Sequence, residues 1–196
     1  MKTRIARIRR TTKETDVTVA VNIDGTGKSR IVTGLPFLNH MLELFSKHSL
    51  IDLMIAAKGD LEVDAHHTTE DIGLTLGEAL NEALGDRRGI VRYGSSYVPM
   101  DDALSRAAVD LGGRPYLVCS LAHKGKRIEK FDLGLLPEFL QALTVQGRMN
   151  LHVAQLYGKD AHHAYESLFK AVARALRMAC ARDPREKGIP SSKGRI

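Results

Sequence analysis

The feature that most constrains this chain is an internal repeat of nearly half its length. The segment HHTTE at residues 66–70 returns as HHAYE at residues 162–166, so the pattern HHxxE recurs after 96 residues in a chain of 196. A second register, displaced by 98 residues, matches the apolar spacing of residues 38–45 to that of residues 136–143. A repeat of this period predicts two similar units that fold around one core.

Apolar residues at helical spacing follow each HHxxE motif, which predicts that each motif opens an amphipathic helix. For the first helix we expect Thr68 or Thr69 as the cap, the acidic residues 70–71 in the first turn, and Gly85 at the end. The second helix should run until residues 183–184, Asp-Pro, stop it. Two shorter helices are predicted over the apolar segments of the second register.

The remaining segments predict strands, and the sequence Gly25-Thr26-Gly27 is a hairpin signal. The expected strands are residues 3–11, 17–23, 30–33 and 53–57 in the first half, and residues 92–97, 105–110, 114–121 and 149–155 in the second. We therefore expect an α+β fold of two duplicated β-β-β-α-β-α halves, each a mainly antiparallel sheet with its helices on one face. The halves span residues 1–90 and 91–183, and a polar, basic tail, residues 184–196, contributes to substrate binding.

Composition excludes several classes of protein. No apolar run approaches the roughly 18 residues of a membrane helix, and the basic first ten residues lead into no hydrophobic stretch, so we expect a cytoplasmic protein without a membrane partner. The two cysteines form no CxxC pair that would suggest a zinc site. A net charge of +6 suits RNA or an anionic small molecule, but a chain without Trp and with only five Tyr and five Phe offers few platforms for stacking bases. We expect no nucleic-acid partner.

The duplicated motif has the chemistry of a metal site. Residues three apart share one face of a helix, so His67 with Glu70, and His163 with Glu166, can each converge on one ion. A single HHxxE segment is equally well an ordinary polar helix start, whereas two copies at equivalent places favour two ions. Mixed imidazole and carboxylate ligands favour Mn, Fe, Co or Zn over Ca or Mg, and the sequence leaves the choice among the four open.

Six segments together resemble one known family over nearly the whole chain: RTTKET at residues 10–15, FLNHML at 37–42, DAHHTTED at 64–71, GGRP at 112–115, HHAYESLFK at 162–170 and PSSKG at 190–194. The family they resemble is that of the imidazoleglycerol-phosphate dehydratases of histidine biosynthesis. The paired HHxxE blocks are the most specific of these segments.

The resemblance implies a lyase that uses two manganese ions to remove water from D-erythro-imidazole-glycerol phosphate and gives imidazole-acetol phosphate. It implies a homo-oligomer of twenty-four subunits with active sites shared between neighbours. Loss of a hydroxyl beside a non-acidic C–H needs an electron sink, which an imidazole ring held by two Lewis acids can supply without a redox cofactor. The implied ligands of one ion are His40, His67, Glu70 and His162, and those of the other are His66, Glu138, His163 and Glu166.

Glu138 is where this sequence departs from the family, which generally has His at that position. The repeat register matches Glu138 to His40, and Glu is a competent oxygen ligand, so we expect it to bind metal. A carboxylate just after Pro137 is also favoured simply by the dipole of the helix that begins there.

The resemblance also assigns catalytic and substrate-binding residues. Glu14 takes the place of the proposed acid/base and contacts substrate, although on sequence alone it is an ordinary charge at a strand end. Asp101 and Asp102 are a second carboxylate candidate, but they equally well shape the turn after Pro99, so only Asp101 is assigned, and weakly. The implied substrate contacts, mainly for the phosphate, are His48, Arg92, Arg114, Lys170, Ser192 and Lys193, which suit an anion through guanidinium and ammonium groups.

Two other classes compete with a metal-dependent lyase. A dinuclear metallohydrolase of a phosphorylated small molecule would use the same ligands to activate water, but it needs neither a base at Glu14 nor an imidazole ring. A basic RNA-binding module would leave the two HHxxE motifs without a role. Turnover of imidazole-glycerol phosphate, compared with release of phosphate from generic esters, separates the two enzymes.

Overall fold

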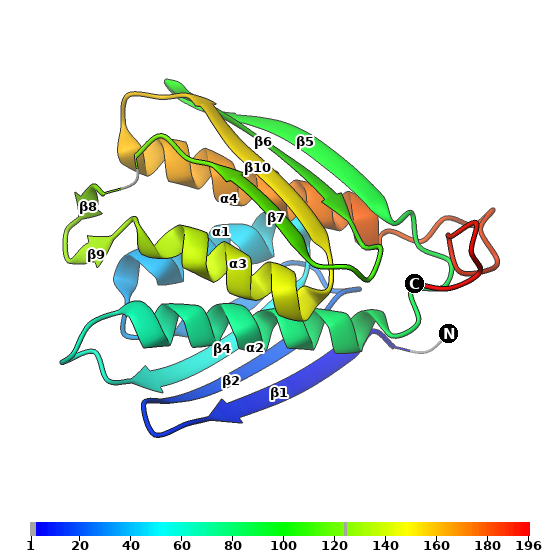
Figure 1. Cartoon of the computed structure of the whole chain (residues 1–196), viewed down its shortest axis with the longest axis horizontal. Helices are drawn as coiled ribbons and strands as arrows, with labels where there is room; N and C mark the ends of the chain where they lie inside the picture. Colours follow the sequence, from blue (N-terminus) through cyan, green and yellow to red (C-terminus); the bar gives the residue numbers. More distant parts are fainter. Residues whose placement is uncertain (1–2, 124) are drawn as a thin grey trace.

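The computed structural model describes residues 3–123 and 125–196, and in it two four-stranded sheets enclose a layer of helices (Figure 1). The first half of the chain supplies one sheet and two of the helices. Its elements are β1 (Ile5–Thr11), β2 (Thr15–Asn22), β3 (Ser29–Val32), α1 (Pro36–Ser49), β4 (Asp52–Gly59) and α2 (His66–Leu84).

The second half repeats this order and adds a short hairpin that the sequence did not predict. Its elements are β5 (Tyr93–Met100), β6 (Ala103–Asp110), β7 (Tyr116–Ser120), the hairpin strands β8 (Arg127–Ile128) and β9 (Phe131–Asp132), α3 (Leu135–Gly147), β10 (Asn150–Tyr157) and α4 (Ala161–Cys180). Among the described residues, no helix is long and apolar enough to cross a membrane.

The two sheets have the same topology, which confirms the expected duplicated α+β fold. The strand order is β1-β2-β4-β3 in one sheet and β5-β6-β10-β7 in the other. In each sheet the third strand of the half pairs in parallel with the fourth, β3 with β4 and β7 with β10, while the other pairs are antiparallel. Each sheet is therefore mainly antiparallel, as the sequence predicted.

Alternating side chains direct one face of each sheet toward the helices. Along β2, Val17, Val19 and Val21 are buried while the intervening residues are only half-buried. This period of two is the pattern of a strand with one face in the core. The helices fill the space between the two inner faces, so a single core is shared by both halves.

The two halves interlock through their helices, because α2 packs against α3 and α1 packs against α4. Gly73 and Gly77 on α2 allow the backbone of α3 to come very close. A Cβ atom added at Gly73 would lie 2.7 Å from the carbonyl oxygen of Phe139, and one added at Gly77 would lie 2.6 Å from that of Leu143. Every helix of one half thus has a principal partner in the other half.

The start of α2 differs from the expectation. The helix begins at His66 after Ala65, without a side-chain cap, and Thr68 and Thr69 are fully buried within it. Residues 70–71 consequently lie beyond the first turn, and the expected caps were wrong because these threonines face the core. The predicted stop is confirmed: Gly85 ends α2 with a positive φ of 58°, and its N–H bonds the carbonyls of Asn81 and Glu82.

Two other local predictions were wrong. Residues 25–27 do not form a hairpin between neighbouring strands, because β4 lies between β2 and β3; the loop instead wraps the carboxylate of Asp52, which accepts the N–H groups of Thr26 and Lys28. Helix α4 ends at Cys180, before residues 183–184. The chain after Cys180 leaves the helix because it pairs with the linker between the halves, through an isolated bridge from Ile90 to Arg182.

Substitution of Gly77 tests the contact between the halves. Ala favours a helix over Gly by about 0.5–1 kcal/mol, but the new Cβ would overlap backbone atoms of α3, which cannot rotate away. We expect Gly77→Ala to lower the free energy of unfolding by about 1–3 kcal/mol, measured by chemical denaturation. Glu78→Ala, at the exposed neighbouring position, is the control and should change it by no more than about 0.5 kcal/mol. An unchanged or more stable Gly77→Ala protein would contradict the close packing.

Candidate functional site

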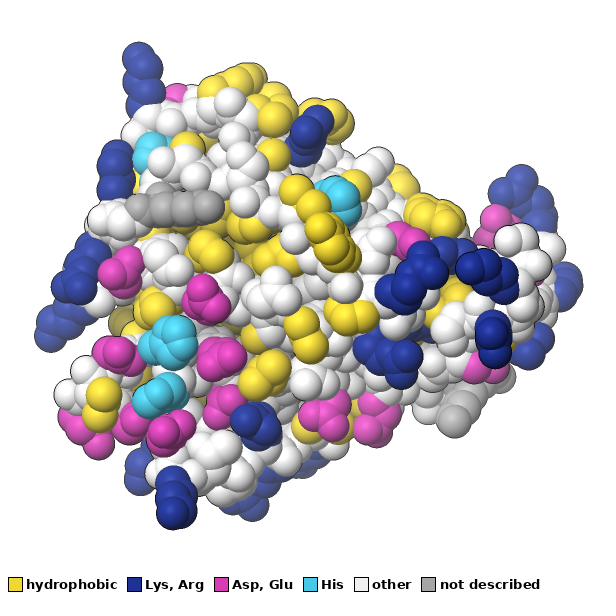
Figure 2. Space-filling model, viewed as in Figure 1, with side chains coloured by type: hydrophobic (Ala, Val, Ile, Leu, Met, Phe, Trp, Pro, Cys, Tyr) yellow, Lys and Arg dark blue, Asp and Glu magenta, His cyan; other side chains and the backbone are white. Residues whose placement is uncertain are grey.

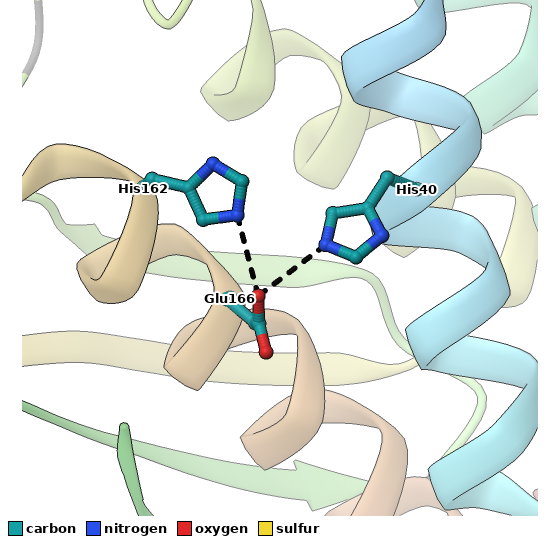
Figure 3. A group of neighbouring side chains, drawn as sticks. All are labelled: His40, His162 and Glu166. Carbon is teal, nitrogen blue, oxygen red and sulfur yellow. Dashed lines mark hydrogen bonds and ion pairs between the residues drawn. The ribbon is translucent and has the colours of Figure 1, made fainter. Parts of the chain in front are cut away.

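Three metal-ligating side chains meet where α1 of the first half crosses α4 of the second (Figure 3). His40 comes from α1, while His162 and Glu166 lie one turn apart on α4. The Nε2 atoms of His40 and His162 are each 3.3 Å from the Glu166 Oε2 atom. One ligand atom from each residue lies within 4.8 Å of the others. We call these three residues the triad.

A buried carboxylate lies at the centre of the triad. Glu166 is 8% exposed, and its Oε1 accepts a hydrogen bond of 2.5 Å from Lys170 one turn further along α4. Burial alone would raise the pKa of Glu166, but the hydrogen bonds from Lys170 and His40 outweigh it, and the pKa is lowered. Glu166 is thus held as an anion between positively charged or polar donors, which is the state that a metal ligand requires.

His48 lies two turns after His40 on α1 and belongs to the same electrostatic surroundings. Burial lowers the pKa of His48, and the nearby charges of Lys170 and Arg174 lower it further. Two of the expected substrate contacts, His48 and Lys170, therefore lie beside the triad.

The second histidine of the α4 motif is oriented by aspartates of the β5–β6 turn. Asp102 Oδ1 lies 2.8 Å from His163 Nδ1, and Asp101 Oδ2 lies 3.5 Å from its Nε2. The hydrogen bond with Asp102 raises the pKa of His163 and lowers that of Asp102. The side chain of Asp160 caps α4 by accepting the N–H of His163. Asp102 therefore engages Nδ1 of His163, while Nε2 lies beside the more exposed carboxylate of Asp101.

The first HHxxE motif forms a separate group at the start of α2. His66 Nε2 lies 3.9 Å from Glu70 Oε2, and His67 Nδ1 lies 3.0 Å from Asp60 Oδ2 and 3.9 Å from Glu14 Oε2. The hydrogen bond with Asp60 raises the pKa of His67 despite its partial desolvation. Figure 2 shows histidine and acidic side chains gathered on this end of the molecule, over the start of α2.

Within one chain these two groups are not one site. Among the described residues the triad is the cluster whose ligand atoms converge, and the side chains of His66, His67 and Glu70 are not part of it. In the single chain Glu166 lies with His40 and His162, which the resemblance assigns to the other ion. The division of the ligands between two ions stays a prediction. Glu138 is exposed in the first turn of α3, outside the triad.

The other expected phosphate contacts lie by the C-terminal tail, which follows the far end of α4 (Figure 1). Arg92 donates to both carboxylate oxygens of Asp110, at 2.7 and 3.1 Å, and to the carbonyl of Pro190. Arg114, Ser192 and Lys193 are exposed in the neighbouring loop and tail. Arg92 thus contacts the tail that carries Ser192 and Lys193, and Gly113, next to Arg114, lies against Ile196 at the end of that tail.

Sequence reasoning missed Asp60, and it considered Asp102 only together with Asp101, as a carboxylate candidate or a residue that shapes a turn, and not as the partner of a motif histidine. Both place a carboxylate on the Nδ1 atom of a motif histidine, which is the usual way to orient an imidazole whose Nε2 binds metal. The only signal in the sequence was the presence of an acid near each motif, and acids are too common in loops for this to be informative.

Comparison with known proteins identifies relatives over most of the chain. The family described as imidazoleglycerol-phosphate dehydratase matches residues 33–176. The chain is 53% identical over 194 residues to the imidazoleglycerol-phosphate dehydratase of a strain of Methylorubrum extorquens, covering 98% of this chain and 100% of the relative. It is also 53% identical over 193 residues to that of a Geobacillus species, covering 98% and 99%.

Two solved structures of the same description have the same fold. The imidazoleglycerol-phosphate dehydratase of Staphylococcus aureus subsp. aureus N315 superposes with a TM-score of 0.83 at 39% identity, covering 91% of this chain and 99% of that one. The enzyme of Pyrococcus furiosus, in complex with (S)-C348, superposes with a TM-score of 0.82 at 39% identity, covering 96% and 100%.

Proposed function

Because the chain belongs to the imidazoleglycerol-phosphate dehydratase family, we propose that it carries out this reaction with two divalent metal ions, most favourably Mn, held by its paired HHxxE motifs. The chain is a hydro-lyase of histidine biosynthesis. The proposal adds the metal ions, the residues that bind them, the D-erythro-imidazole-glycerol phosphate substrate, the shared active site, and a place in the cytoplasm, where amino-acid precursors are made.

The triad of His40, His162 and Glu166 is the observation that carries the metal proposal. Two imidazole nitrogens and one carboxylate oxygen within 4.8 Å form a donor set suited to Mn, Fe, Co or Zn. The carboxylate is buried and its lowered pKa keeps it ionised. His67 and His163 would extend this donor set through Nε2, since a carboxylate on the Nδ1 atom of each ring fixes its orientation.

Separation of the ligands within one chain supports a site shared between copies. The triad and the His66-His67-Glu70 group each offer only part of two coordination spheres. The expected phosphate contacts are also divided, with Lys170 and His48 beside the triad and the others by the C-terminal tail. In our proposal the first motif of one chain meets the triad of its neighbour, in a homo-oligomer that the family resemblance puts at twenty-four subunits. No single chain then holds a complete site.

The chain's own residues divide the remaining tasks. When bound, the two ions supply Lewis acidity to the imidazole ring, which allows loss of the hydroxyl without a redox cofactor. The Glu14 carboxylate, half-exposed beside His67, removes the proton from carbon and returns a proton to the product. Lys170 and His48, with the arginines and the tail of the chain, hold the phosphate and so fix the reacting carbons against Glu14.

Removal of one triad ligand tests the metal proposal. His162→Ala deletes one of three converging donor atoms, so we expect metal affinity to fall by more than the roughly 10–100-fold that follows loss of a merely supporting residue, and turnover to be lost. The measurement is Mn bound per chain at equilibrium, together with turnover. His152→Ala, an exposed histidine on β10, is the matched control and should retain both. Full metal content and normal turnover in His162→Ala would refute the assignment.

Glu138 can be tested through its departure from the family. Glu138→Gln removes the anionic oxygen but keeps the shape, so metal titration should show weaker binding of one of the two ions. Glu138→His should restore two-ion binding with an altered metal preference, because imidazole is a softer ligand than carboxylate. If Glu138 is only a helix-start charge, Gln costs about 0.3–1 kcal/mol of stability and both ions bind unchanged, which would remove Glu138 from the ligand set.

Metal and assembly should be coupled if neighbouring chains complete the two coordination spheres. Treatment with a chelator should then shrink the particle, and added Mn should restore it. Small-angle or light scattering measures the size in each state. A particle of the same large size with and without metal would count against the coupling, and a fully active monomer would overturn the shared site.

A further inference from the structure

A buried carboxylate that the proposed chemistry does not use fastens the β1–β2 turn to α2. Asp71 is 6% exposed and directly follows Glu70. Its Oδ1 accepts a hydrogen bond of 2.8 Å from Arg10 Nε, and its Oδ2 accepts the hydroxyl of Thr15, which is itself buried. Arg10 and Thr15 lie on the two strands that flank the turn. We call these three residues the turn latch.

Hydrogen bonds join the turn latch to the backbone of Glu14. Thr12 Oγ1 accepts the N–H groups of Glu14 and Thr15, at 3.1 and 3.0 Å, and the N–H of Thr12 donates to the carbonyl of Thr15 at 2.8 Å. The turn is therefore rigidly connected to Thr15, and through Thr15 to Asp71. The chain of contacts links Glu14 to the helix that carries His66 and His67.

The Glu14 side chain needs such support because His67 does not hold it directly. Its Oε2 is 3.9 Å from His67 Nδ1, beyond hydrogen-bond distance. Asp60 occupies that nitrogen at 3.0 Å instead. The Glu14 side chain is 54% exposed, so its carboxylate is available for proton transfer, and its place beside the histidine depends on the turn beneath it.

The second half of the chain is a natural comparison. Ser167 stands five residues after His162, as Asp71 does after His66, and Ala103 begins β6 as Thr15 begins β2. There the link is neutral, a 2.6 Å hydrogen bond between the hydroxyls of Ser167 and Ser105. In that half the turn acid Asp102 contacts its histidine directly. The charged latch occurs in the half whose turn acid, Glu14, makes no hydrogen bond to the imidazole.

We propose that Asp71 is a positioning residue for the dehydration, which acts through the turn latch to place the Glu14 carboxylate beside the His66-His67 pair. The inference rests on the proposed function, in which Glu14 transfers the proton. Asp71 is buried, its carboxylate oxygens bond Arg10 and Thr15, and it is not part of the triad. Its effect is on the geometry of proton transfer and not on binding.

Kinetics of Asp71→Asn test this proposal, because the variant keeps the shape and removes the charge that holds Arg10. We expect kcat to fall by about 10-fold or more, since misplacement by 1 Å can cost about 100-fold. KM and bound Mn per chain should change less than kcat. Thr15→Val removes the hydroxyl donor at nearly constant shape and should act in the same direction. Asp16→Asn, which breaks an exposed pair with Arg9 on the same hairpin, is the control and should leave kcat unchanged.

A double-mutant cycle shows whether Asp71 acts through Glu14. In a Glu14→Gln background, Asp71→Asn should lower kcat little further, since the group it positions is already gone. Equal effects of Asp71→Asn in both backgrounds would overturn the positioning role and leave Glu14 as the acid/base. A Glu14→Gln enzyme with full kcat would overturn the role of Glu14 and this proposal with it. Loss of thermal stability or of metal from Asp71→Asn with kcat unchanged would overturn the positioning role alone.

Discussion

The close approach of α2 to α3 is the constraint on which the rest of the structure depends. Gly73 and Gly77 admit the α3 backbone, so a helix of the first half is buried against a helix of the second. The repeat makes the reciprocal contact between α1 and α4. His40 meets His162 and Glu166 at that second crossing, and the triad exists because the helices of one half pack against those of the other.

The two similar motifs have carboxylate partners that come from different segments. The second histidine of each motif has a carboxylate on Nδ1, but it comes from the β4–α2 loop for His67 and from the β5–β6 turn for His163. In the first half Asp60, and not the turn acid Glu14, makes the hydrogen bond that orients the imidazole. The equivalent turns of the two halves therefore differ: Asp102 of one turn lies 2.8 Å from its imidazole, whereas Glu14 of the other lies 3.9 Å from its own.

The fold was predictable to a greater extent than the site. A repeat and two hydrophobic periods determined the strands and helices, since burial of one face is a property of each segment alone. The burial of Thr68 and Thr69, the loop around Asp52 and the partner of Glu166 were not predictable, because each depends on what another segment places nearby. Helical spacing favoured His163 with Glu166, yet the neighbouring α1 brings His40 to that carboxylate, and His162, one full turn before Glu166, is the motif histidine that reaches it.

Exposure of the proposed ligands is the main physical argument for our proposal that the complete site lies between chains. The side chains of His40, His162, His66 and Glu70 are 43–45% exposed, although each stands in a fixed array of charged neighbours. Water at such positions weakens electrostatic interactions. Exclusion of this solvent water from an active site strengthens them and so favours the reaction. In the part of the chain that the structure describes, no second layer covers either group. A neighbouring chain that brings the first motif to the triad would supply the missing ligands and exclude the water in the same contact.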